Sequence, residues 1–220
     1  MGARARYLMT QAVVIVGAGG HAKVCIELLR ASGTPIACCI GSGDSADFCL
    51  DVPVFKGDAH LARLRNEGHA RAFIAIGANA VRQRLAAEAK AVGYELVNAI
   101  SPAAVVSPSV RLGHGIAIMA GAVINADTSI ADLAIINTSA SVDHDGDIGE
   151  AAHVAPQCGL AGNVTIGPRA FLGVGCKVIP GVSIGNDVVA GAGSVIVADV
   201  RPNARIAGVP ARNMKERTTK

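Results

Sequence analysis

Aliphatic residues recur at every sixth position through the C-terminal half of the chain, and no insertion breaks the register. An amphipathic helix repeats every 3.6 residues and an open sheet alternates every two, so neither explains a period of six. Six-residue repeats predict a parallel β-helix, in which three repeats form one coil of about 18 residues with three flat faces. The repeated positions, which we call anchors, are Ile100, Val106, Leu112, Ile118, Ile124, Ile130, Ile136, Val142, Ile148, Val154, Leu160, Ile166, Leu172, Val178, Ile184, Ala190 and Ile196.

Small or aliphatic residues stand four positions after the anchors, and we expect them to let the chain turn each corner. Cys158, Cys176 and Ser194 are 18 positions apart and are expected to form one column in the prism. Aromatic residues make up only 3% of the chain, as a narrow core of aliphatic layers requires. The period does not give the handedness of the coil, because ordinary parallel crossovers are right-handed.

The N-terminal third alternates predicted strands and helices. Such alternation indicates a Rossmann-like parallel sheet covered by helices. We therefore expect an α/β domain over residues 1–98, a parallel β-helix over 99–201 and a C-terminal tail over 202–220. The apolar runs predict strands at 13–16, 36–40, 72–76 and 94–97, and helices from about 24 to 32 and from 80 to 91.

A glycine-rich loop, Gly17-Ala18-Gly19-Gly20-His21-Ala22, follows the first predicted strand and nearly matches the pattern of dinucleotide-binding folds. Such a loop places free N–H groups at a helix start, where phosphate binds. The second strand ends in Ile40-Gly41-Ser42, without the acidic residue that holds an NAD ribose. The pattern predicts a nucleotide-phosphate site and not an NAD site. The alternative is that the glycines only permit a tight turn.

Charge and composition narrow the classes of partner. The chain has 220 residues and a formal net charge of +3. Residues 100–198 carry three Lys or Arg against seven Asp or Glu, which argues against nucleic acid as the main partner. No run of 18 apolar residues predicts a membrane helix, and Met1–Thr10 lacks the apolar stretch of a secretion signal. Six cysteines without a C-x-x-C pair indicate a reduced, cytoplasmic protein.

His144 has the most distinctive surroundings of the six histidines. It stands two positions after the anchor Val142, so its side chain is expected to point away from the prism. A neighbouring carboxylate orients an imidazole and favours its protonated form. Zinc is not expected, because His144 and His153 are half a coil apart and no third histidine stacks with them. The acidic neighbours are Asp143, Asp145, Asp147 and Glu150.

Together, several motifs resemble those of a sugar acetyltransferase family in which a nucleotide-sugar-binding βα domain precedes a left-handed β-helix. The family includes N-acetyltransferases of nucleotide-linked 4-amino-4,6-dideoxy sugars and sialic acid O-acetyltransferases. The resemblance runs from about residue 12 to 214 and implies the left-handed form of the predicted β-helix. The matching motifs are Gly17–Lys23, Ile76–Asn79 with Arg82, Asn137–Ser139, Val142–Asp145, His153, Leu160–Asn163 and Gly208–Ala211.

The resemblance implies a homotrimer that uses acetyl-CoA, and no metal, to acetylate the C4 amino group of a nucleotide-linked sugar in lipopolysaccharide O-antigen biosynthesis. It implies that His144 is the general base and that Asp145 is its carboxylate partner. It places acetyl-CoA against His153, Gly162, Val174 and Ala192. The substrate contacts that it implies are Gly17, Gly19, Gly20, His21, Gly77, Asn79, Arg82 and Asn137.

The segment after the second predicted strand departs from the family pattern, and this departure bears on which nucleotide base the protein binds. Many members that use UDP-sugars carry consecutive aspartates after the second strand, whereas this chain has Ile40-Gly41-Ser42-Gly43-Asp44. The departure disfavours uridine, and the resemblance then suggests GDP-perosamine as the acceptor. Two alternatives stay open: acetylation of a sugar hydroxyl at the same site, or binding of a nucleotide sugar without turnover.

Overall fold

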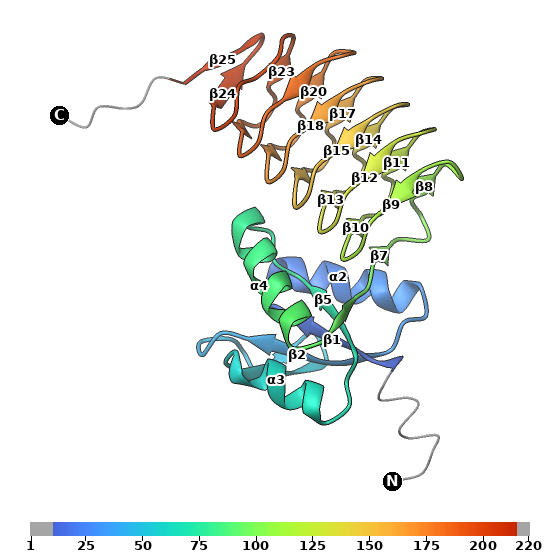
Figure 1. The fold of residues 1–220 in the computed structure, drawn as a ribbon, viewed down its shortest axis with the longest axis vertical. Helices are drawn as coiled ribbons and strands as arrows, with labels where there is room; N and C mark the ends of the chain where they lie inside the picture. Colours follow the sequence, from blue (N-terminus) through green and yellow to red (C-terminus); the bar gives the residue numbers. More distant parts are fainter. Residues whose placement is uncertain (1–10, 215–220) are drawn as a thin grey trace, which may run out of the picture. The chain divides into compact units, whose positions relative to one another are not determined.

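A computed structural model of the chain describes residues 11–214. The chain divides into two compact units, one made of residues 1–102 with 114–117 and the other of 103–113 with 118–220 (Figure 1). Met1–Thr10, for which the sequence predicts no secretion signal, lies outside the described residues. Within residues 11–214, no helix has the length and apolarity needed to cross a membrane.

The N-terminal unit is built on a six-stranded sheet with the strand order β3-β4-β2-β1-β5-β6. All neighbouring strands are parallel except β3 and β4, which form an antiparallel hairpin. The Rossmann-like α/β fold predicted from the sequence is confirmed. The strands are β1 (Val13–Val16), β2 (Ile36–Gly41), β3 (Phe48–Cys49), β4 (Val52–Lys56), β5 (Arg71–Ile74) and β6 (Glu95–Leu96).

Three helices connect these strands: α2 (Gly20–Ala31), α3 (Ala59–Asn66) and α4 (Asn79–Ala91). The connections β1–α2–β2 and β4–α3–β5 run in opposite directions across the sheet, so right-handed crossovers place α2 and α3 on opposite faces (Figure 1). Strand β1 therefore has β2 on one side and β5 on the other. In parallel α/β sheets this reversal of strand order marks the crevice where ligands bind.

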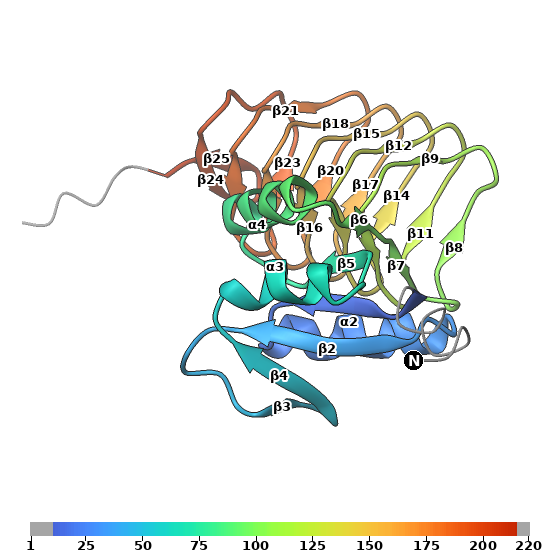
Figure 2. The same ribbon diagram turned by 60° about the horizontal axis from the view of Figure 1, so that its bottom comes forward.

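From β7 onward the chain forms a left-handed parallel β-helix, in which each of the strands β7 to β23 is two residues long (Figures 1 and 2). Every anchor predicted from the six-residue period is the second residue of one of the strands β7 to β23. The first face holds β7 (Ala99–Ile100), β10 (Ala117–Ile118), β13 (Ile135–Ile136), β16 (His153–Val154), β19 (Phe171–Leu172), β22 (Val189–Ala190), β24 (Arg205–Gly208) and β25 (Ala211–Asn213). The second face holds β8 (Val105–Val106), β11 (Val123–Ile124), β14 (Ser141–Val142), β17 (Gly159–Leu160), β20 (Lys177–Val178) and β23 (Val195–Ile196). The third face holds β9 (Arg111–Leu112), β12 (Ser129–Ile130), β15 (Asp147–Ile148), β18 (Thr165–Ile166) and β21 (Ser183–Ile184).

The corners of the β-helix are made by the third residue after each anchor. From Gly115 to Gly193 this residue has a left-handed backbone, with φ between 53° and 73°. Asp and Asn adopt this conformation more readily than most residues, and Asp127, Asp145 and Asn163 are examples. The small fourth residue, to which the sequence analysis assigned the turn, instead packs inside the corner, as the fully buried Ala140 does.

The predicted column of Cys158, Cys176 and Ser194 forms inside one corner of the prism, and all three residues are buried. Each thiol donates to a main-chain carbonyl one coil away, Cys158 Sγ to Gly173 O at 3.1 Å and Cys176 Sγ to Gly191 O at 3.2 Å. These hydrogen bonds satisfy the buried S–H groups, so the two cysteines need no disulfide between them. The cysteines therefore act as small core residues.

We expect protein purified without oxidant and then denatured to show six free thiols when titrated with a thiol reagent. All six cysteines are buried as free thiols, so air oxidation of the folded chain is slow. A count of four would reveal one disulfide and would contradict the packing of Cys158 and Cys176 as separate thiols.

Candidate active site and nucleotide site

The N-terminal unit contains a pocket of about 420 Å³ at the carboxyl ends of β1 and β2. Phosphate-bearing ligands bind at this edge of parallel sheets, outside the strand ends. Of the predicted substrate residues, two from the glycine-rich loop line it directly. The lining residues are Val16, Gly17, Ala18, Gly19, Ile40, Gly41, Ser42, Asp44, Ser45, Asp58, Ile76, Arg84 and Leu85.

Gly17 and Gly19 are thus the two predicted substrate residues that line this pocket. Gly17 has a φ of +121°, and a Cβ there would lie 2.7 Å from Ala75 O, so no larger residue fits between β1 and the end of β5. Gly19 caps α2 without any side-chain hydrogen bond, and a Cβ at Gly19 or Gly20 would meet nothing within 4 Å. The first N–H groups of α2 have no acceptor within the helix, and the glycines leave room beside them, which is the arrangement that binds phosphate.

The loop after β5 and the first turn of α4 carry three more predicted substrate residues, Gly77, Asn79 and Arg82. Arg82 is only 1% exposed. Its Nη1 donates to Ile76 O at 2.9 Å and to Gly77 O at 3.0 Å, and its Nη2 donates to Asn79 Oδ1 at 2.9 Å. The guanidinium thus holds the loop from inside rather than lining the pocket.

Three charged residues of the pocket were missed in the sequence analysis: Asp44, Asp58 and Arg84. Asp58 stands at the start of α3, but its side chain makes no capping hydrogen bond to that helix. The signal was present, because an acidic residue before an amphipathic stretch marks a helix start. It was overlooked because α3 itself was not predicted.

His144 lies at the corner between the second and third faces, in the turn that joins β14 to β15. Its side chain is 55% exposed, as its predicted outward position requires. The ring atom Nδ1 lies 2.7 Å from Asp145 Oδ2. The hydrogen bond with Asp145, followed by the charges of Asp143 and Asp145, raises the pKa of His144 above its ordinary value. With Nδ1–H donated to Asp145, the second nitrogen, Nε2, is left free to accept a proton.

A second carboxylate fixes the backbone beneath this pair. Asp143 Oδ1 accepts from the His144 backbone N–H at 2.9 Å and from Asn125 Nδ2, one coil away, at 2.9 Å. The hydrogen bond from Asn125, followed by that from the His144 amide, lowers the pKa of Asp143. Asn125 was missed in the sequence analysis, although its distance of 18 positions from Asp143 was a signal that the two would stack.

Gly162 lies one coil further along the same corner, against the imidazole of His144. A Cβ at Gly162 would lie 2.6 Å from both Cε1 and Nε2 of that ring, so only glycine leaves room for it. The backbone N–H of Asn163 donates to His144 O at 2.9 Å. Within residues 11–214, no acceptor is hydrogen-bonded to the Gly162 N–H. An oxygen bound beside His144 therefore has a donor within this corner.

The remaining predicted residues of the β-helix lie elsewhere on the prism. His153 is on the first face, where its Nε2 lies 3.0 Å from Asn137 Nδ2 and its ring meets Phe171 edge-on at 5.2 Å. Val174 and Ala192 are 18 positions apart and occupy the corner between the first and second faces. Within one chain, the width of the second face therefore separates Val174 and Ala192 from His144 and Gly162.

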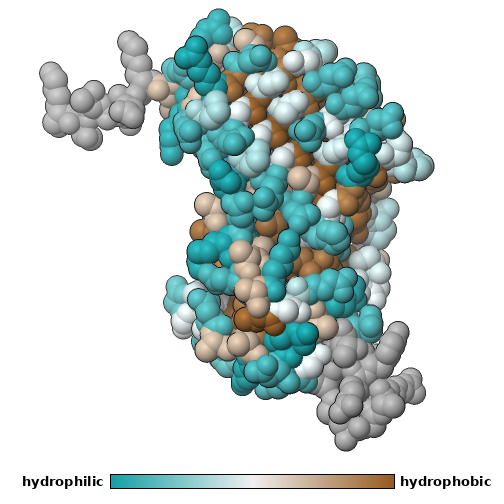
Figure 3. Space-filling model, in the orientation of Figure 1, coloured by the Kyte–Doolittle hydropathy of each residue, from teal (hydrophilic) through white to brown (hydrophobic). Residues whose placement is uncertain are grey.

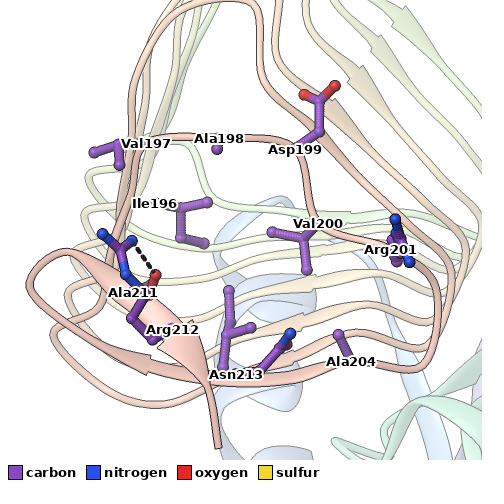
Figure 4. Close-up of a pocket in the computed structure, with 11 residues that line it drawn as sticks. Ile196, Val197, Ala198, Asp199, Val200, Arg201, Ala204, Ala211, Arg212 and Asn213 are labelled. Atoms are coloured by element: carbon purple, nitrogen blue, oxygen red, sulfur yellow. Dashed lines mark hydrogen bonds between the residues drawn. The ribbon is translucent and has the colours of Figure 1, made fainter.

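A further pocket, of about 290 Å³, lies at the C-terminal end of the prism (Figure 4). Ile196 and Val200 point into the last coil, whereas Asp199 points outward. Strands β24 and β25 form one wall, within the segment that the sequence analysis treated as a tail. None of the predicted site residues lines this pocket, which is the open end of the β-helix. Within residues 11–214, no group of three metal-binding side chains is found.

We expect the Asp145→Asn variant to move the acid limb of the kcat–pH profile to lower pH, by about one unit. A general base works in its neutral form, and loss of the Asp145 charge lowers the pKa of His144, so His144 stays neutral to lower pH. The measurement is kcat between pH 5 and 8, with Asp147→Asn, an exposed acid two positions away, as the control. An acid limb that stays in place or moves to higher pH would contradict the assignment.

Comparison with known proteins identifies the family. A family model described as the PglD N-terminal domain matches residues 12–89. PerB from Caulobacter crescentus, solved with CoA and GDP-perosamine, is 54% identical, with a TM-score of 0.90 over 93% of this chain and 97% of that chain. The acetyltransferase domain of PglB from Neisseria gonorrhoeae, solved with acetyl coenzyme A, is 35% identical, with a TM-score of 0.87 over 93% of this chain and 100% of that domain.

An uncharacterized protein of Acanthamoeba polyphaga mimivirus is 28% identical over 125 residues, which are 56% of this chain. The chain spans only 24% of the length of that viral protein. PerB, by contrast, matches over nearly the full length of both chains. The protein therefore belongs to the family of CoA-dependent acetyltransferases that join a PglD N-terminal domain to a left-handed β-helix.

Proposed function

We propose that the protein transfers the acetyl group of acetyl-CoA to the C4 amino group of a nucleotide-linked 4-amino-4,6-dideoxy sugar, and that this substrate is GDP-perosamine. The observation that carries the proposal is the 54% identity to PerB, whose structure holds CoA and GDP-perosamine. The His144–Asp145 pair beside Gly162 supplies the chemistry that such a transfer needs. We also propose that the enzyme is cytoplasmic, on the evidence of its reduced cysteines, and that it serves lipopolysaccharide O-antigen biosynthesis, as the family resemblance implies.

The reaction is a direct transfer without a covalent enzyme intermediate. The amine nitrogen attacks the thioester carbonyl carbon, and His144 Nε2 accepts the proton that this nitrogen loses. Asp145 holds the ring through Nδ1 and stabilises the imidazolium that forms. The Gly162 N–H donates to the carbonyl oxygen as negative charge develops on it. The C–S bond then breaks, and the CoA thiolate takes the proton back from His144.

The acidic residues of the pocket in the N-terminal unit favour guanine as the base of the proposed substrate. Guanine presents two adjacent donors, N1–H and the N2 amino group, whereas uracil presents only N3–H. An ionised carboxylate accepts two such donors at once. The pocket has two carboxylates, Asp44 and Asp58, and the side chain of Asp58 is not used to cap α3. The first amides of α2 take the diphosphate.

The separation of the predicted residues on one prism supports a trimer with shared sites. His144 and Gly162 lie at one corner, and Val174 and Ala192 lie at another, so one acetyl-CoA reaches both sets only if two prisms stand side by side. Val174, Ile179 and Val197 are more than 40% exposed, and apolar surface lies in rows along the β-helix (Figure 3). Packing against another copy removes this surface from water.

We therefore expect a trimer in solution and activity that depends on it. Light scattering or analytical ultracentrifugation at the assay concentration measures the mass, against 22.2 kDa for one chain. A fully active monomer would contradict both the shared site and the placement of acetyl-CoA against Val174 and Ala192.

The proposed activity is tested by following CoA thiol release from acetyl-CoA with a panel of nucleotide sugars. We expect release with GDP-perosamine, much slower release with UDP- and dTDP-linked amino sugars, and none with the matching hydroxy sugars. Faster release with a hydroxy sugar would indicate an O-acetyltransferase. Binding without any release would indicate a protein that holds nucleotide sugars without turning them over.

A further inference from the structure

Arg84 is the only cation among the described residues that line the pocket at the carboxyl ends of β1 and β2. It lies in α4, and its Nη1 donates to Glu88 Oε1 at 2.6 Å, one turn further along the helix. Glu88 is not one of the lining residues, whereas Asp44 and Asp58 are. The guanidinium therefore pairs with an acid outside the pocket and does not neutralise either acid within it.

The ion pair with Glu88 orients the guanidinium without burying it. The side chains of Arg84 and Glu88 are 60% and 43% exposed, and an exposed pair four residues apart on a helix adds little to stability. Within residues 11–214, the hydrogen bond to Glu88 is the one that the Arg84 side chain makes. Arginine has five N–H donors in a planar fork, so Nε–H and Nη2–H remain available side by side along one edge.

Two parallel N–H donors match a base that presents two adjacent acceptors. Guanine carries O6 and N7 side by side on one edge, and arginine bound to both is the commonest specific contact to a base. Adenine has an amino donor next to N7, and thymine has a methyl group next to O4. Uracil has only a C–H group in the place of that methyl. Among these four bases, guanine alone offers both acceptors to Arg84.

The rest of the pocket suits the same base. The apolar residues Ile40, Ile76 and Leu85 are part of its lining, as the faces of a flat aromatic ring require. Asp58 precedes α3 without capping it, so its carboxylate can accept from the N1–H and the N2 amino group of guanine. A cation and an acid within one pocket thus match the acceptor edge and the donor edge of guanine.

We propose that Arg84 selects the base of the nucleotide sugar by donating its Nε–H and Nη2–H to N7 and O6 of guanine. The carboxylate of Asp58 accepts from the donor edge of the same ring, and the first amides of α2 take the diphosphate. Loss of Arg84 therefore lowers the preference for guanine and spares the contacts to the diphosphate. The inference rests on the proposed GDP-linked substrate, to which it adds the side chain that recognises the base.

The test is isothermal titration calorimetry with GDP, UDP and 7-deaza-GDP. UDP shares the ribose and diphosphate of GDP, and 7-deaza-GDP has a C–H group in place of N7. We expect the unchanged protein to bind GDP more tightly than the other two. Arg84→Met should weaken GDP binding by about ten-fold and leave UDP binding within about two-fold. In that variant GDP and 7-deaza-GDP should bind alike, because N7 no longer meets a donor.

Arg84→Lys separates recognition of the base from simple charge. Lysine keeps the positive charge but lacks two parallel donors, so we expect it to restore little of the affinity for GDP. Arg63→Met is the matched control, because Arg63 pairs with Glu67, also four residues further along its helix, and lies outside the pocket. It should leave the binding of all three nucleotides unchanged. Circular dichroism of each variant confirms the fold.

An equal loss for GDP and UDP in Arg84→Met, restored in Arg84→Lys, would place Arg84 at the diphosphate and overturn the proposal. A preference for GDP over 7-deaza-GDP that persists in Arg84→Met would overturn it as well. Failure of the proposed substrate gives a different result: the unchanged protein would then bind UDP at least as tightly as GDP, and guanine recognition by any residue would be excluded. The measurement needs no acetyl-CoA, so it does not depend on acetyl transfer.

Discussion

The His144→Asn variant is expected to lower kcat by about 10²–10⁴-fold, the range in which a general base contributes. Asparagine keeps a polar side chain of similar reach but cannot accept a proton at neutral pH. The residue is 55% exposed at a corner of the prism, so its loss leaves the buried layers untouched. The fold should therefore survive, and the effect should fall on catalysis alone.

The measurement is CoA release at saturating acetyl-CoA and nucleotide sugar, with circular dichroism to confirm the fold. His114→Asn, the same change at another exposed histidine, is the matched control and should keep normal turnover. Near-normal turnover of a well-folded His144→Asn variant would remove His144 from the mechanism.

The Gly162→Ala variant is expected to lower kcat by about 10²-fold or more, although it adds a single methyl group. That methyl would lie 2.6 Å from Cε1 and Nε2 of His144, so the imidazole has to leave its position. A displacement of about 1 Å in a reacting group costs about 10²-fold in rate. The same substitution crowds the Gly162 N–H that we assign to the developing oxyanion.

Gly159→Ala is the control for this experiment, because Gly159 lies in the strand just before Gly162. There the atoms nearest to a Cβ would be those at the flexible end of Lys177, at 3.2 Å, and that side chain can move aside. We expect Gly159→Ala to retain most of the activity. Equal losses in both variants would mean that the β-helix tolerates no added methyl group here, and the effect of Gly162→Ala could not be assigned to His144.

The β-helix was predictable because its geometry repeats strictly. Each coil stacks on the next with the same register, as in the pairs Ser141 with Gly159 and Val142 with Leu160, so every anchor has the same environment. The N-terminal unit was predicted less completely. The hairpin β3–β4 and helix α3 were missed, because Pro53 interrupts the strand pattern and α3 buries only Leu61 and Leu64. Their positions depend on tertiary packing more than on local pattern.

The candidate site was also predictable only in part. The outward position of His144 followed from the register, and Asp145 followed as its neighbour in the chain. The requirement for glycine at position 162 rests on the distance to the His144 ring, which the period alone does not give. The burial of Arg82 was not predictable either, because an arginine near a glycine loop usually points to the ligand, whereas here the loop folds around it.

The repeating corner also limits how the length of the β-helix can change. Inserting one residue would move every later anchor out of the core and every left-handed position onto a residue unsuited to it. Adding or removing 18 residues keeps all three faces in register. The prism can therefore grow or shrink only in whole coils, in steps of about 4.8 Å. Any groove along it has a length fixed in the same steps, so related enzymes would adapt to longer or shorter ligands by gaining or losing entire coils.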